Sequence, residues 1–392
     1  MQTVATIPQE LPLKTRERVV LYPARGRVHA LRDFVDARIG MLHDVEQALI
    51  AERFDDLAAS APRELSMPLV RTQRLHTGAP ATSAIRRGTR SAFIPSLELK
   101  LKGCRPEPAA FPAWELDEQY RIRVVQIPFG VLRAESVMRE VLGYCCVRRL
   151  GLTVTSVPVA VMEYADVPTD ARFALVSRLV HDHRIESRLD CGGLTLHALL
   201  RLHASPRASE LLGREAGLTG MDRRRYAEAK TDWLIALNAA GGFRGILNSN
   251  LGNDVVEGAD LAGLCDFDTF AVHAVPDRSD TDGIRRFVHL AVLELIKTSL
   301  PFVDFMDVSH LAREDACATL ACYYRAHSSI CRAYEPKLLR TAASLGWDGD
   351  LVQSEMDAAY RTQAAGELLK ELIPNSMAFQ EFRSDSWYVA HG

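Results

Sequence analysis

The sequence has no CxxC pair, and this absence argues against two classes of site. Structural zinc sites and small disulfide frameworks use cysteines at short, repeated spacings. The eight cysteines here are scattered between Cys104 and Cys331 without such a spacing. We therefore expect reduced thiols and a cytoplasmic protein, the setting in which free cysteines are usual.

Long apolar runs and an excess of one charge are missing as well. No run reaches the roughly 18 apolar residues that a membrane span requires, and residues 1–20 lack the apolar core of a secretory signal. The formal net charge is −3 over 392 residues, so we expect neither nucleic acid nor a membrane as a partner. With 47% hydrophobic residues, a chain of this length can bury a sizeable core in about two or three lobes.

Strand-like patterns lie mainly in the first half of the chain, and helical patterns fill the second half. Alternating apolar residues predict strands over 66–104 and 121–127, and helical spacing predicts a helix over 133–151. After Val180 the pattern is helical apart from one short hairpin. This order predicts an α+β protein with a protein-kinase-like bilobal fold, in which a small β-rich N-lobe precedes a large helical C-lobe. The expected divisions are an N-terminal arm and helix (1–62), the N-lobe (63–182) and the helical C-lobe with the catalytic-loop hairpin (183–392).

The segment FRGILNSNLGN (243–253) places three asparagines in one loop, and the strand end LCDFD follows it. Asn248 lies five residues before Asn253, which lies thirteen residues before Asp266. A β-hairpin between the last two would bring an amide oxygen and a carboxylate together, a pair of hard oxygen ligands that suits Mg²⁺. The alternative is that Asn248, Asn250 and Asn253 are ordinary turn residues and Asp266 is an exposed loop acid.

Two further residues are candidates for holding phosphate. In the strand pattern LELKLKG, Lys100 and Lys102 share one face, and one of them could reach a triphosphate. Glu140 lies in the middle of the following helix, where it could orient Lys102. The alternatives are a solvated strand face for the lysines and a local pair with Arg133 or Arg139 for the glutamate.

Two arginines lie near the junction of the expected lobes. Arg178 and Arg184, in VSRLVHDHRIE, could bind phosphate oxygens with paired N–H groups. Salt bridges to Asp182 or Glu186 are the equally acceptable alternative.

Taken together, these segments resemble the selenoprotein O family of kinase-fold protein adenylyltransferases. LELKLKGCRP is similar to the family's LQLKG segment, and VLRAESVMREVLG is similar to its helix that carries a glutamate. ALVSRLVHDHRIE, GGFRGILNSN and GLCDFDTFAV are similar to three further family segments. The similarity follows the family's order, with gaps, over residues 95–275.

The resemblance implies a function and roles for particular residues. It implies ATP with Mg²⁺ or Mn²⁺ as cofactors and AMP transfer as the reaction. Lys102 and Glu140 would match the family's lysine and glutamate, and Arg178 and Arg184 would match the arginines that hold an inverted nucleotide. Asp266 would match the family's aspartate that holds the metal.

The chain departs from the family pattern in the loop. The family's loop histidine is Arg244 here, its loop aspartate falls on Asn250 and its following asparagine falls on Leu251. With ordinary kinase spacing, the catalytic aspartate falls on Asn248 instead and the metal asparagine on Asn253. Under either alignment no carboxylate stands at the base position, and an asparagine cannot accept a proton. The neighbouring Asp254 is the candidate substitute.

Two other family features are weak or missing. The glycine-rich phosphate loop is represented by Gly78 and Gly88 alone, and the family's C-terminal redox motif is absent. We expect AMP transfer to a protein hydroxyl or a small molecule. A phosphotransferase acting on a small metabolite and a nucleotide-binding pseudokinase scaffold stay open as alternatives. The sequence does not predict the acceptor or the oligomeric state.

Overall fold

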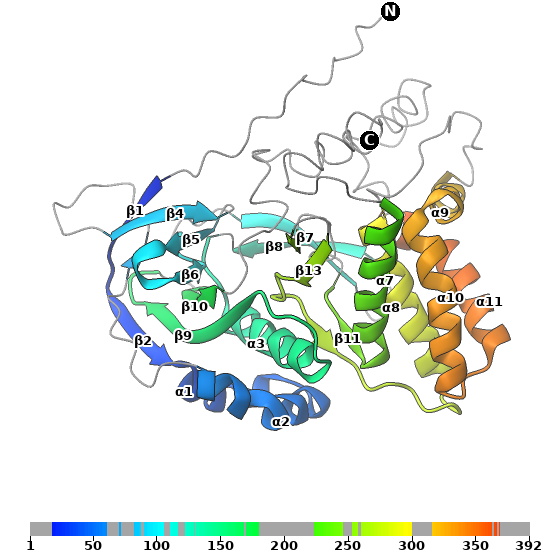
Figure 1. Cartoon of the computed structure of the whole chain (residues 1–392), viewed down its shortest axis with the longest axis horizontal. Coiled ribbons are helices and arrows are strands. Elements are labelled where there is room, and N and C mark those ends of the chain that lie inside the picture. The colour runs from blue at the N-terminus through cyan, green and yellow to red at the C-terminus, as the bar shows by residue number, and fades with distance from the viewer. Residues whose placement is uncertain are drawn as a thin grey trace, which may run out of the picture.

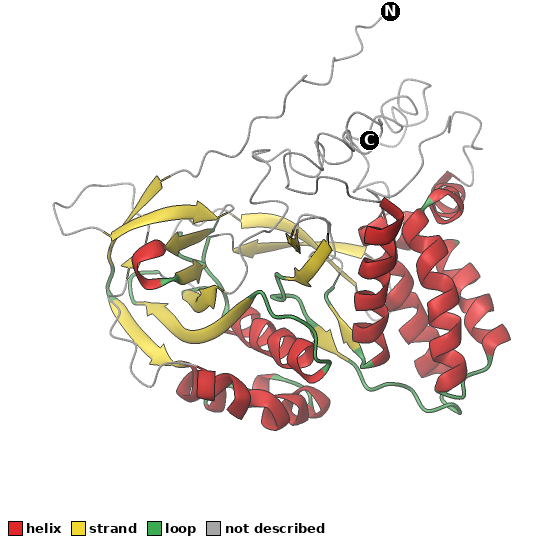
Figure 2. Cartoon of the chain, viewed as in Figure 1, coloured by secondary structure: helices red, strands yellow, loops and turns green. Residues whose placement is uncertain are grey.

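The protein is an α+β structure, with a curled antiparallel sheet in its N-terminal part and mostly helices in the rest (Figures 1 and 2). The computed structural model describes residues 18–60, 70–71, 82–87, 90–105, 110–116, 122–128, 130–167, 170–179, 223–245, 253–257, 260–299, 316–362, 364–366 and 368. Within these residues, no helix is both long and apolar enough to span a membrane.

Eight strands form the large sheet, in the order β2-β9-β10-β6-β5-β4-β1-β3 with antiparallel neighbours. They are β1 (Arg18–Pro23), β2 (Gly26–Ala30), β3 (Val70–Arg71), β4 (Thr82–Arg87), β5 (Ser91–Ile94), β6 (Leu99–Lys102), β9 (Ser156–Tyr164) and β10 (Phe173–Leu179). A separate hairpin consists of β7 (Ala110–Leu116) and β8 (Ile122–Pro128). Residues 18–30, which the sequence assigned to an N-terminal arm and the start of a helix, instead contribute two strands to the sheet.

The central strand β6 explains how the sheet positions the site. Because side chains alternate along a strand, Leu99 and Leu101 point to one face and Lys100 and Lys102 to the other. The two leucines belong to a core cluster with Leu21, Ala84 and other residues of that face. The lysines therefore share the opposite face, which is the face that the helices partly cover.

Three helices pack against this second face (Figure 1). They are α1 (Leu31–Asp36), α2 (Asp44–Ser60) and α3 (Ala134–Arg149), and short 3₁₀ helices lie at Ile39–Met41 and Pro95–Leu97. Buried residues of α2 and α3, such as Leu49 and Val141, form one core with Val161 of β9 and Leu175 of β10. The helix predicted over 133–151 is confirmed as α3.

The C-terminal part is a helical bundle with short strands at its edge. Its helices are α7 (Arg223–Ala239), α8 (Thr281–Ser299), α9 (Ala316–His327), α10 (Ser329–Ser344) and α11 (Gly349–Tyr360), joined by one apolar core. Between α7 and α8 lie β11 (Gly242–Phe243), β12 (Asp254–Glu257), β13 (Asp260–Leu264) and β14 (Ala271–Val272). The hairpin predicted between Asn253 and Asp266 is confirmed as β12–β13. A bridge from Leu264 to Val154 brings this hairpin against the N-terminal part.

Candidate functional site

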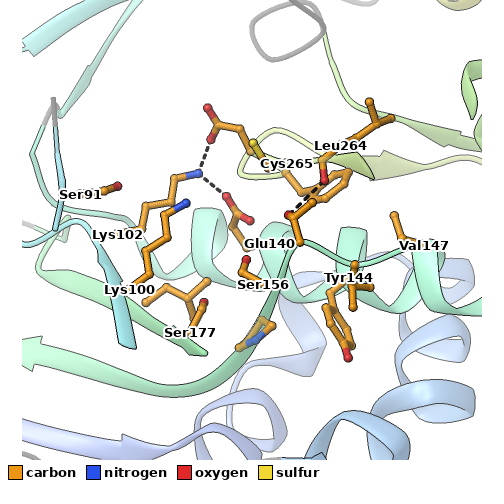
Figure 3. A pocket seen from close by; sticks show the side chains of 16 residues that line it. Ser91, Lys100, Lys102, Glu140, Tyr144, Val147, Ser156, Ser177, Leu264 and Cys265 are labelled. Atoms are coloured by element: carbon orange, nitrogen blue, oxygen red, sulfur yellow. Dashed lines mark hydrogen bonds and ion pairs between the residues drawn. The ribbon is translucent and has the colours of Figure 1, made fainter. Parts of the chain in front are cut away.

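Lys102 lies between carboxylates that come from two distant parts of the chain (Figure 3). Its Nζ donates hydrogen bonds to Glu140 of α3 and to Asp266, which directly follows the β12–β13 hairpin. The same nitrogen lies 3.4 Å from Oδ2 of Asp268. The structure therefore brings together Lys102, Glu140 and Asp266, three residues that sequence analysis selected separately.

The charges in this cluster keep Lys102 protonated. Burial alone would lower the pKa of its ammonium group, but the nearby carboxylates of Asp266, Asp268 and Glu140 outweigh burial and raise that pKa above its ordinary value. The side chain is only 11% exposed, so solvent screens these interactions weakly. Lys102 is therefore a permanent cation that can donate to an anionic ligand.

Two residues of the cluster were not selected from the sequence. Arg90 precedes β5 and its guanidinium pairs with Asp268 and lies 3.9 Å from Oδ1 of Asp266. Burial lowers the pKa of Arg90, but Asp268 and Asp266 raise it further, so the net change is upward. The signal for Asp268 was present in the sequence as the second acid of the DFD segment. Arg90 carried no comparable signal, because its approach depends on the strand pairing.

The three acids fit a divalent cation. Ligand oxygens of Glu140, Asp266 and Asp268 all lie within 4.8 Å of one another. Hard cations such as Mg²⁺ prefer oxygen ligands of this kind. Lys102 and Arg90 contribute two positive charges against three negative ones, so the cluster retains a net charge of −1. The donor set therefore fits Mg²⁺, on condition that the Lys102 ammonium group moves from Asp266 towards a bound ligand.

The backbone around Asp266 is unusual and tightly packed. Asp266 has φ of 68°, a left-handed conformation that is costly for a residue other than glycine and is typical of functional sites. The next residue, Phe267, packs on Gly143 of α3, where a Cβ atom would lie 2.4 Å from the ring Cγ. Only glycine allows this approach, which holds the helix of Glu140 against the segment of Asp266.

Helix α3 is also held from its other side by α2. Glu46 of α2 is fully buried and accepts hydrogen bonds from Arg139 and from the backbone N–H of Val272, the latter at 3.0 Å. Its second carboxylate oxygen accepts the N–H of His43 at 3.1 Å. Arg139 thus pairs with Glu46 and not with its neighbour Glu140, which leaves Glu140 for Lys102.

The candidate base Asp254 lies in a closed ion-pair network. It is fully buried, and its two carboxylate oxygens accept hydrogen bonds from Lys230 and, at 2.7 Å, from the Tyr226 hydroxyl. Nη1 of Arg244 lies 3.6 Å from Asp254, and Nη2 donates to the Cys265 carbonyl at 2.7 Å. The acid adjacent to the loop is therefore engaged in the core, and its side chain is closed off from solvent.

Asn253 is buried at the start of the hairpin. Its main-chain carbonyl oxygen accepts the N–H of Cys265 at 3.0 Å, which places Asn253 beside the residue that precedes Asp266. Its role as a metal ligand stays a prediction. The predicted site residues Asn248, Asn250, Arg184 and Gly78 lie outside the described residues.

Arg178 does not face the cluster. It is exposed, and it pairs across the sheet with Leu99, whose side chain belongs to the opposite core. The preceding residue Ser177 pairs with Lys100 and shares the face of the lysines. Because side chains alternate along a strand, Arg178 points away from the face on which the predicted phosphate-binding arginines would lie.

A pocket with an empty volume of about 620 Å³ lies over the lysine face of β6, α3 and the Asp266 segment (Figure 3). This volume includes space at the open mouth of the pocket. The lining consists of Ser91, Lys100, Lys102, Glu140, Tyr144, Val147, Val154, Thr155, Ser156, Pro158, Leu175, Ser177, Leu264, Cys265, Asp266 and Phe267.

Comparison of the chain with models of known protein families, with curated proteins and with solved structures found no match in any of the three.

Proposed function

We propose that the chain is an ATP- and Mg²⁺-dependent transferase with a protein-kinase-like fold. One observation carries the proposal: Lys102 contacts Glu140 and Asp266 at once, at the edge of a pocket. Catalysis of phosphoryl-type transfer consists mostly of positioning and charge stabilisation. A held lysine beside a group of metal-binding carboxylates supplies both.

Each residue of the cluster has a task in this proposal. Asp266 and Asp268 would hold Mg²⁺, which supplies positive charge to the phosphate that reacts. Lys102 would transfer its hydrogen bond from Asp266 to phosphate oxygens while Glu140 keeps it oriented. Arg90 would balance the charge of Asp268 as the ligand enters.

AMP transfer is our first proposal for the reaction, and its support is the resemblance of residues 95–275 to the selenoprotein O family. An acceptor oxygen would form a bond to the α-phosphorus as the bond to the β-phosphate oxygen breaks. Pyrophosphate leaves with the electron pair, and the acceptor proton passes to water, because Asp254 is engaged elsewhere. The absence of a carboxylate base would slow the reaction by about 10²–10⁴-fold relative to an enzyme that has one.

Transfer of the γ-phosphate is the second candidate. The observation that favours it is the orientation of Arg178, which turns away from the pocket face and so weakens the argument for an inverted nucleotide. Lys102, Glu140 and Asp266 would serve this reaction equally well.

Incubation with ATP labelled at the α- or the γ-phosphate tests the proposal against both alternatives. The label would be followed on protein substrates and on small metabolites from a cell extract, with Lys102→Met as the inactive control. An α-label on an acceptor supports AMP transfer, and a γ-label supports phosphoryl transfer. If neither label transfers, while ATP with Mg²⁺ or Mn²⁺ raises the Tm, the chain is a nucleotide-binding scaffold. If there is no Tm shift at millimolar nucleotide either, the proposal of a nucleotide site is wrong.

A further inference from the structure

Lys100 is a second lysine in the same pocket, and no step above uses it. It lies on β6, the strand between β5 and β10, where it pairs with Phe93 and Ser177. Lys100 and Lys102 both line the pocket, and Figure 3 shows the two side chains reaching into the same space. Residues two apart on a strand are separated by about 7 Å, a span that neighbouring phosphates of one oligophosphate can bridge.

Hydroxyl groups lie close to Lys100 in the pocket wall, beside the apolar side chains of Pro158 and Leu175. Ser177 lies directly opposite Lys100 on β10, and Ser156 lies on the adjoining strand β9. The acids in the pocket lining are Glu140 and Asp266, and both bind Lys102. Hydroxyl and ammonium donors together suit the oxygens of a phosphate, whereas a purine base is usually held between apolar side chains.

We propose that Lys100, Ser156 and Ser177 form a subsite for the terminal phosphate of the triphosphate that Lys102 holds. This inference rests on the proposed function and fixes the direction of the ligand. The triphosphate runs along β6 from the carboxylate cluster to Lys100, so its α-phosphate lies at the Asp266 end and its nucleoside lies beyond.

The direction has a chemical consequence. When an acceptor oxygen bonds to the α-phosphorus and the bond to the β-phosphate oxygen breaks, the negative charge grows on pyrophosphate. Lys100 and Lys102 are both placed to stabilise that leaving group, and the acceptor proton is released to water. The subsite therefore supports AMP transfer by an argument that does not involve Arg178 or Arg184.

The test is calorimetric titration of the full chain with three probes in the presence of Mg²⁺: inorganic tripolyphosphate, ATP and AMP. The variants are Lys100→Met, which keeps the aliphatic length without the charge, and Lys100→Arg, which keeps the charge. Arg332→Met, which removes an exposed cation from α10, is the matched control. We expect Lys100→Met to weaken tripolyphosphate and ATP by about tenfold to a hundredfold and to leave AMP within about twofold. Lys100→Arg and the control should stay within about threefold of the original chain.

Two results overturn the inference while the proposed function stands: unchanged ATP binding in Lys100→Met, or an equal loss for ATP and AMP. The second result would place the AMP moiety, and not the terminal phosphate, at Lys100. If the original chain binds neither ATP nor tripolyphosphate, the proposed function itself fails. Should Lys100→Met not fold, Ser177→Ala replaces it, with an expected loss of about threefold to tenfold for tripolyphosphate and ATP and no loss for AMP.

Discussion

The pocket and the helical core each contain a buried lysine paired with an aspartate, but the two pairs have different surroundings. Lys102 has three carboxylates nearby, and its pKa is raised although burial opposes this. Lys230 is shut into the core with Asp254, and burial together with the Arg244 charge lowers its pKa to about 8. The ratio of acids to cations therefore decides whether a buried lysine holds its proton more tightly or less tightly than in water.

The difference also separates a candidate site from a structural element. The pocket cluster keeps a net charge of −1 and its side chains are 8–15% exposed, so it can exchange partners with a ligand. The core pair has no exposed side chain, and Asp254 already accepts hydrogen bonds from Lys230 and Tyr226. Substitutions in the pocket cluster should therefore lower activity more than stability. Substitutions in the core pair should lower stability more than activity.

Lys102→Met should give the largest effect on function. Loss of a positioned cationic donor is expected to lower transferase activity by about 10²–10³-fold, because that donor acts where charge develops. The free energy of unfolding should change little, since Arg90 and Mg²⁺ can still neutralise the acids. Label transfer from ATP and chemical denaturation measure the two quantities, with Arg332→Met as the control. Full activity in Lys102→Met would remove the lysine from the proposed mechanism.

Asp254→Asn should give the largest effect on stability. The change leaves Lys230 and Arg244 buried without their carboxylate, which costs about 3–5 kcal/mol of unfolding free energy. Urea denaturation measures this loss, and nucleotide binding by the molecules that stay folded should be unchanged. If Asp254→Asn is as stable as the original chain but loses activity, Asp254 acts as the catalytic base and not as a structural residue.

Lys297→Met extends the comparison to a third buried lysine, through the pH dependence of the unfolding free energy. Burial lowers the pKa of Lys297 from 10.5 to about 7. Between these values the unfolded chain binds more protons at this residue than the folded chain does, so its contribution to stability rises with pH. The variant should therefore exceed the original chain in unfolding free energy at pH 7, and the difference should shrink towards pH 10. A pH-independent difference would show that Lys297 does not titrate in this window.

Gly143→Ala should lower both stability and function, each by less than the variants that remove a charge from the site or the core. The added methyl would overlap the Phe267 ring, and overpacking of this kind costs about 1–3 kcal/mol. The displaced helix would draw Glu140 away from Lys102 and weaken ATP binding. Gly349→Ala is the matched control, because a Cβ atom at that glycine meets no atom within 4 Å. Equal behaviour of the two variants in Tm and ATP titration would contradict the account of the Phe267 contact.

The sequence predicted the parts of the site that depend on local periodicity. Strand alternation put Lys100 and Lys102 on one face, and the spacing of Asn253 and Asp266 indicated the hairpin between them. Sequence could not show that Arg178 faces away, because this depends on the register of β10 against β6. Nor could it place Asp254 in the core, because its partner Lys230 comes from a separate helix.

The central claim is that Lys102, Asp266 and Asp268 form one binding site for Mg²⁺ and a triphosphate. Calorimetric titration of the original chain and of Asp266→Asn with ATP, each with and without Mg²⁺, tests it most directly. The account predicts that Mg²⁺ strengthens ATP binding to the original chain and has no such effect on Asp266→Asn. Binding of ATP that is equally strong with and without Mg²⁺, or equally strong in both chains, would contradict it.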